Sequence, residues 1–130
     1  MNKILIVDDV PGWVRFHTNN IEYLNLPDVE IDSAYSAKEG LAKIEANIDN
    51  PYNVILTDLQ MESDFLPKSA GEWFIEQIKT YSKYYKNTKI VIISASPAIE
   101  RIAKRLETDY VSKTKIRNSD SSIYKKFLNQ

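Results

Sequence analysis

Three short apolar runs constrain the fold of this chain more than any other feature of its sequence. They are Ile4-Leu5-Ile6-Val7, Val54-Ile55-Leu56 and Ile90-Val91-Ile92-Ile93. Continuous rather than alternating apolar residues are typical of strands that are buried on both faces of a parallel sheet. Polar residues follow each run: Asp8-Asp9, Thr57-Asp58 and Ser94. The carboxyl ends of parallel strands meet at one edge, where ligands bind in open α/β sheets. We therefore expect these side chains to converge on one small site.

The segments between and after these runs read as alternating helices and strands. Capping boxes at Ser36–Glu39 and Ser69–Glu72 each precede a helix, and Ser96-Pro97 predicts a third helix that is capped by Ser96. The predicted elements are strands at 4–7, 29–35, 53–57, 89–94 and 109–112, helices at 11–25, 37–48, 70–81, 97–106 and 119–129, and a loop at 62–70. This alternation predicts one α/β domain over 1–130, with a five-stranded doubly wound parallel sheet and helices on both faces.

Composition narrows the class of protein. The 130 residues are 43% hydrophobic, which suffices for one compact core, and they include no Cys, so disulfides and thiolate metal sites are excluded. No apolar segment has the length of a signal or membrane-spanning segment, so we expect a cytoplasmic protein without membrane insertion. Residues 1–65 carry 12 acidic and 4 basic residues, a net charge of −8, whereas residues 66–130 carry 6 and 13, a net charge of +7. An acidic half suits cation binding, and a basic half suits an acidic partner surface.

The polar residues at the predicted strand ends favour an oxygen-ligated cation. Asp8, Asp9 and Asp58 suffice for Mg²⁺, which takes one or two carboxylates, water and phosphate oxygens. Three crowded carboxylates repel one another, and Lys113, just after the last strand, is the candidate to offset that repulsion. Singly, most of these residues have ordinary structural explanations, such as a helix cap for Asp9 or Ser96, or a core aromatic for Tyr110. Asp58 is the hardest to explain in that way. His17, on a helix face, is assigned no role.

Together these residues resemble a known family, the receiver domain of bacterial two-component response regulators of the CheY-like type. The resemblance covers essentially the whole chain. It depends on residues 3–9, Asp58-Leu59-Gln60-Met61, Gly71 with Phe74, Ser94-Ala95 and residues 110–113. It implies the flavodoxin-like strand order 2-1-3-4-5 and a divergent, stand-alone receiver.

The resemblance also implies roles for these residues. Asp58 would accept a phosphoryl group from a phosphohistidine, and Mg²⁺ would be bound by Asp8, Asp9, Asp58 and the Gln60 carbonyl. Lys113 and Ser94 would hold the phosphoryl oxygens. Ser94 and Tyr110 would then switch the surface of the fourth helix, fifth strand and fifth helix.

This surface carries a set of basic residues that suits an acidic downstream protein: Lys104, Arg105, Lys115, Arg117, Lys125 and Lys126. The implied upstream partner is a sensor histidine kinase or phosphotransfer protein, with no direct contact to nucleic acid. The protein would be a phosphoacceptor with at most weak self-phosphorylation and autodephosphorylation, not an enzyme in the usual sense.

The chain departs from the family pattern at two positions that bear on function. Glu62 rather than Pro follows Met61, and nine residues separate Met61 from Gly71. Thr114 takes the place of the Pro that usually follows the lysine through a cis bond, so we expect a trans bond here. These departures keep a second reading open, a pseudo-receiver that acts as a phosphorylation-independent interaction module. A haloacid-dehalogenase-type phosphohydrolase ranks third because the chain has adjacent Asp8-Asp9 in place of Asp-x-Asp.

Overall fold

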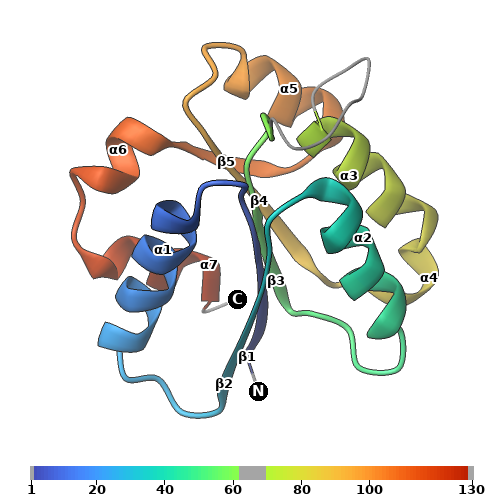
Figure 1. The fold of residues 1–130 in the computed structure, drawn as a ribbon, viewed down its shortest axis with the longest axis horizontal. Helices are drawn as coiled ribbons and strands as arrows, with labels where there is room; N and C mark the ends of the chain where they lie inside the picture. The colour runs from blue at the N-terminus through green and yellow to red at the C-terminus, as the bar shows by residue number, and fades with distance from the viewer. Residues whose placement is uncertain (1, 62–69, 129–130) are drawn as a thin grey trace.

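A computed structural model describes residues 2–61 and 70–128 as one α/β unit (Figure 1). The five strands are β1 (Asn2–Val7), β2 (Val29–Ala34), β3 (Val54–Thr57), β4 (Lys89–Ser94) and β5 (Asp109–Ser112). The helices are α1 (Pro11–Tyr23), α2 (Ala37–Ala46), α3 (Ala70–Thr80), α4 (Ser82–Tyr85), α5 (Ile99–Leu106), α6 (Lys113–Arg117), the 3₁₀ turn η1 (Ser121–Tyr124) and α7 (Lys125–Leu128). All strand pairs are parallel, in the order β2-β1-β3-β4-β5. The predicted fold class and strand order are confirmed.

Helices cover both faces of the sheet, as the continuous apolar runs predict. In Figure 1, α1, α6 and α7 lie on one side of the sheet, and α2, α3 and α4 lie on the other. Successive residues of β1 point to opposite faces: Ile4 and Ile6 belong to the core under α1, whereas Leu5 and Val7 belong to the core under α2 and α3. All four are at most 1% exposed. Their burial on both faces explains why the run shows no polar alternation.

The strand register aligns the predicted polar residues at one edge of the sheet. Val7 pairs with Thr57, and Thr57 pairs with Ile92, so Asp8 and Asp58 follow directly after paired residues. Ser94 pairs with Ser112, and Lys113 comes next. Parallel pairing therefore brings the ends of four strands together, which is the geometry that the sequence predicts.

The three predicted serine caps have different outcomes. Ser36 caps α2, since its Oγ accepts a hydrogen bond of 3.0 Å from the N–H of Glu39. The Ser69 cap and most of the predicted 62–70 loop lie outside the described residues. The prediction for Ser96 is wrong: α5 starts at Ile99, and the Ser96 Oγ instead accepts from the N–H of Ala98 at 3.2 Å. That bond closes a turn ahead of the helix, a known alternative for Ser side chains.

The C-terminal region also differs from the prediction of a single helix at 119–129. Ser112 Oγ accepts from the N–H of Lys115 at 3.1 Å and caps an additional helix, α6, immediately after β5. Asp120 Oδ1 then accepts from the N–H of Ser122 at 2.9 Å and starts η1, which continues into one turn of α7. Two local caps thus divide the region into three short segments, because each cap fixes a new helix start.

Helices α3 and α5 are joined by both apolar and charged contacts. Ile75 of α3 packs with Ile99 and Ile102 of α5 in one buried cluster. Above it, the Arg105 guanidinium contacts Glu72 and lies 3.6 Å from the Glu76 carboxylate. The two helices are therefore connected over more than one turn of each.

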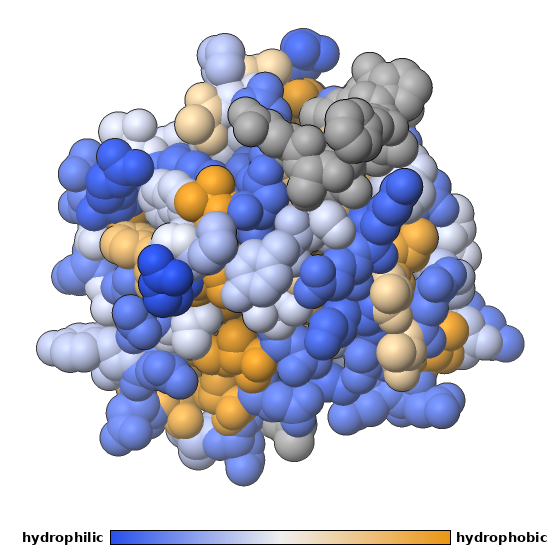
Figure 2. Space-filling model, in the orientation of Figure 1, coloured by the Kyte–Doolittle hydropathy of each residue, from blue (hydrophilic) through white to orange (hydrophobic). Residues whose placement is uncertain are grey.

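The edge strand β2 is only half covered, as expected from its alternating sequence. Figure 2 shows an apolar patch between α1 and β2 in the lower part of the view, and Leu26, Val29 and Ile31 line a hollow there.

In the parts of the chain that the structure describes, no helix has the length and apolar character needed to cross a bilayer.

Candidate functional site

Three carboxylates meet at the carboxyl edge of the sheet. Asp8, Asp9 and Asp58 each place an oxygen within 4.8 Å of the others. Backbone bonds fix two of them: the N–H of Asp8 donates to Ala34 O at 3.1 Å, and the N–H of Asp58 donates to Val7 O at 3.0 Å. Asp8 and Asp58 are 2% and 6% exposed, so little water screens their mutual repulsion.

Lys113 provides the positive charge that this cluster requires. Its Nζ lies 3.0 Å from Asp8 Oδ2 and 2.9 Å from Asp58 Oδ2. Burial alone would lower the pKa of Lys113, but the hydrogen bonds and negative charges of Asp58 and Asp8 outweigh burial and raise that pKa. Lys113 is therefore protonated and bridges the two carboxylates. The Lys113–Thr114 peptide is trans, as predicted.

The other carboxylate contacts orient the site. Asp58 Oδ1 accepts a bond of 2.6 Å from the N–H of Leu59, and Asp8 Oδ1 accepts one of 2.9 Å from the N–H of Val10. Burial raises the pKa of Asp8, and the charge of Asp58 adds to that rise, against the bonds from Val10 and Lys113. The cluster thus holds three carboxyl groups against one lysine. Its oxygen-only donors at this spacing fit a hard divalent cation such as Mg²⁺, so the residues present match the predicted metal.

The remaining predicted residues lie around this cluster. Ser94 is 1% exposed at the end of β4, and its Oγ accepts from the N–H of Ser96 at 3.1 Å. Gln60 is exposed two residues after Asp58. Tyr110 is not a core aromatic, since it is 40% exposed on β5. The strand ends therefore hold the predicted acids, lysine and serine, with Tyr110 on the outer strand.

Sequence reasoning missed an aromatic group next to Lys113. The Trp13 ring lies 4.9 Å from the Lys113 Nζ and 5.3 Å from the Arg117 guanidinium carbon. Behind it, His17 is 2% exposed and its Nδ1 is hydrogen-bonded to the Tyr124 hydroxyl at 2.6 Å. Burial lowers the pKa of His17 to about 3, and the charge of Lys113 acts in the same direction. The aromatic residues at 13–17 are visible in the sequence, but nothing local in it links them to Lys113, 100 residues further along the chain.

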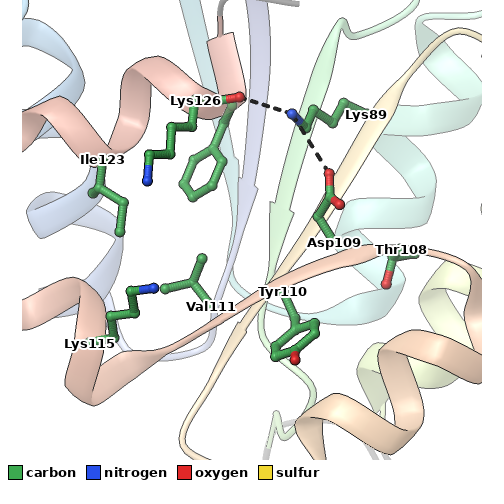
Figure 3. A pocket seen from close by; sticks show the side chains of 9 residues that line it. Lys89, Thr108, Asp109, Tyr110, Val111, Lys115, Ile123 and Lys126 are labelled. Atoms are coloured by element: carbon green, nitrogen blue, oxygen red, sulfur yellow. Dashed lines mark hydrogen bonds and ion pairs between the residues drawn. The ribbon is translucent and has the colours of Figure 1, made fainter.

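The basic residues of the predicted surface fall into two groups, those with an acidic partner and those beside a hollow. Lys104 pairs with Glu100 at 3.6 Å, and Arg105 pairs with α3, so both charges are partly neutralised. Lys115 and Lys126 instead line a hollow of about 380 Å³ beside β5. Figure 3 shows their ammonium groups on the side of the hollow where Val111 and Ile123 lie. Within residues 2–61 and 70–128, neither ammonium has an acidic partner.

Fold and site together define a doubly wound α/β protein with a cluster of carboxylates, two of which are bridged by a buried lysine. Residues 4–119 match the family described as response regulator receiver domain. The chain therefore belongs to the response regulator receiver domain family of two-component systems.

Solved receiver structures show the same fold at low sequence identity. The chain is similar to a CheY-like receiver domain protein from Methanospirillum hungatei JF-1 (22% identity, TM-score 0.67, covering 97% of this chain and 89% of that one). It is also similar to a receiver domain protein from Clostridium thermocellum (21%, TM-score 0.74, 99% and 92%). A third similar structure is a Burkholderia pseudomallei response regulator that contains a phosphorylated aspartic acid and a calcium ion (17%, TM-score 0.72, 98% and 66%). No curated protein matches the chain.

Proposed function

We propose that this receiver domain accepts a phosphoryl group on Asp58 from a phosphohistidine of a sensor kinase or phosphotransfer protein. The observation that carries the proposal is the setting of the Asp58 carboxylate. It is buried at the sheet edge, within 4.8 Å of two further acids, and 2.9 Å from the Lys113 ammonium. A buried carboxylate that is held by one cation and by the backbone N–H groups of Leu59 and Gln60 is oriented for nucleophilic attack.

Phosphoryl transfer to Asp58 would exchange one bond to phosphorus for another. An Asp58 oxygen forms a bond to phosphorus while the bond from phosphorus to the histidine nitrogen breaks, and the imidazole leaves with the bonding electron pair. Lys113 stands where it can neutralise a phosphoryl oxygen, and the buried Ser94 hydroxyl can donate to another. Mg²⁺, when bound by Asp8, Asp9 and Asp58, would offset the remaining negative charge, which is the main requirement of phosphoryl transfer. Attack of water on phosphorus would return free Asp58 as a slow autodephosphorylation, so the protein is a switch rather than a turnover enzyme.

We propose that the downstream partner binds beside β5. Strand β5 carries Tyr110 and Val111 at the hollow of Figure 3 and continues into Lys113 at the acidic cluster. Movement of Ser94 and Tyr110 on phosphorylation would therefore change the hollow directly. Because Lys115 and Lys126 have no acidic partner among the residues that the structure describes, an acidic protein surface is the complementary partner.

A mass measurement tests the phosphoacceptor proposal. Incubation with acetyl phosphate and Mg²⁺ should add about 80 Da, one phosphoryl group on the nucleophile. Asp58→Asn and EDTA should each abolish the gain. If the wild type gains no mass and binds no beryllofluoride, the protein is the alternative, a pseudo-receiver that binds partners without phosphorylation.

A binding measurement tests the partner surface. Reversing the charges of Lys115 and Lys126 to Glu should slow association with the cognate output protein and weaken its salt dependence. The matched control reverses Lys38 and Lys43 on α2. Equal association rates for both double variants at low salt would contradict the assignment.

A further inference from the structure

The Lys113 side chain is placed by means that differ from the family pattern. Family members usually have a cis Pro after this lysine, whereas here Thr114 follows through a trans bond and helix α6 begins at Lys113 itself. Lysine has a flexible four-carbon stem, so an ammonium without further contacts samples many positions. Its two carboxylate partners both lie on the strand-end side, and one of them, Asp58, is the group that reacts.

Trp13 supplies a contact from the other side. Lys113 and Arg117 are four residues apart in α6 and so lie on the same helix face. Both approach the indole ring of Trp13, at 4.9 Å for the Lys113 Nζ and 5.3 Å for the Arg117 guanidinium carbon. An aromatic face attracts cations at these distances, and more strongly where water is excluded. Lys113 is only 9% exposed, so its contact is of the stronger kind.

The indole is itself held in place. Trp13 is the third residue of α1, the helix that follows Asp8-Asp9. Its ring packs edge-on against Phe16 at 5.3 Å and lies 5.6 Å from the ring of His17. His17 in turn is bonded to Tyr124 of η1. Trp13 therefore presents a fixed surface, which does not depend on the chemical state of Asp58.

We propose that Trp13 is a positioning residue for Lys113, holding the ammonium beside the acidic cluster. This proposal rests on the proposed phosphoacceptor function for its kinetic consequence but not for its geometry. When Asp58 becomes an acyl phosphate, its direct contact with the Lys113 ammonium changes, whereas the indole contact remains. The ammonium then stays within reach of the phosphoryl oxygens.

The kinetic test compares three variants in phosphorylation by acetyl phosphate with Mg²⁺. Trp13→Leu should lower the rate constant about tenfold, since the cation–π contribution is lost from the reactive arrangement. Trp13→Phe keeps an aromatic face and should recover to within about threefold of the wild type. Tyr23→Leu is the matched control: it removes an aromatic ring of the same helix that is 80% exposed and takes no part in holding Trp13 or Lys113, so its rate should be unchanged. A Trp13→Leu rate equal to that of the wild type, or an equal loss in Tyr23→Leu, would overturn the proposal.

A second measurement needs no phosphorylation. In protein with ¹³C-labelled lysine, the ε-methylene protons of Lys113 should be shifted upfield by the ring current of the indole, with the signal assigned by Lys113→Met. Trp13→Leu should abolish this shift, and Tyr23→Leu, which removes an exposed ring of the same helix, should retain it. If the wild type takes up no phosphoryl group, the proposed function fails while this measurement still decides the position of Lys113. An unshifted Lys113 signal in the wild type would refute the positioning role.

Discussion

Gly71 and Gly12 form a pair of sites at which the same substitution should have opposite effects. A Cβ on Gly71 would lie 2.1 Å from Asp58 O and 2.5 Å from Leu59 Cα, both backbone atoms. Real Cβ atoms essentially never approach another heavy atom more closely than 3.0 Å. The start of α3 must therefore move by about 0.9 Å, which is the difference between this 3.0 Å limit and the 2.1 Å contact with Asp58 O. At Gly12 the nearest atom is the flexible end of Arg15, 3.9 Å away.

The expected magnitudes follow from these contacts. Gly71→Ala adds overpacking of about 1–3 kcal/mol and weakens the 2.8 Å bond from its N–H to Leu59 O, which contributes about 1 kcal/mol. We expect a loss of about 3 kcal/mol in the free energy of unfolding, or about 10 °C in Tm for a domain of this size. Gly12→Ala should instead gain about 0.5–1 kcal/mol, because alanine favours the helix. Urea denaturation followed by circular dichroism measures both. A Gly71→Ala stability within about 0.5 kcal/mol of the wild type would refute the reasoning from backbone contact.

Three further predictions concern protonation, metal and capping. The folded pKa of His17 is lowered to about 3, so its stabilising contribution is complete above the unfolded pKa near 6.5 and is lost as the pH falls. Between about pH 7.5 and about pH 5, the free energy of unfolding of the wild type should fall by about 2 kcal/mol more than that of His17→Gln. Urea denaturation midpoints at each pH measure this difference. Parallel pH profiles of the two proteins would exclude a neutral buried His17. Mg²⁺ at about ten times its Kd should raise the free energy of unfolding by about 1.4 kcal/mol, and EDTA or Asp9→Asn should remove that increment in thermal melts. Ser36→Ala should cost about 1 kcal/mol through loss of the α2 cap, whereas Ser36→Asp should restore stability.

The sheet and the acidic cluster could be predicted because their signals are local and repeated. Each buried strand contains a continuous apolar run; Asp8 and Ser94 come directly after such runs, and Asp58 follows one after a single Thr. Parallel pairing then brings these residues together, because the carboxyl ends of parallel strands all lie at the same edge of the sheet. The same locality explains why the Ser36 cap was predicted correctly.

The errors and omissions arise where competing local bonds or distant contacts decide the structure. The Ser96 side chain can either cap a helix or close a turn, and in the structure it closes a turn. Near the C-terminus, Ser112 and Asp120 each start a new segment, a signal that apolar spacing alone overlooked. The contact of Trp13 with Lys113 joins the first helix to the sixth, and no local pattern encodes a contact between elements so far apart in the chain.

The connection between α3 and α5 has a consequence for how the domain opens. The Arg105 bridge to Glu72 and Glu76 is half-exposed and contributes little stability by itself, but the same two helices also share the apolar cluster of Ile75 and Ile99. Displacing α5 alone would break both connections between the helices, whereas displacing the two helices together would keep these connections and expose Leu59 and Ile92 of the same cluster. We therefore expect their amide protons to exchange with solvent as one cooperative unit. In such a unit, a disturbance at the Ser94 end of β4 reaches the helix that begins beside Asp58 without passing through the sheet.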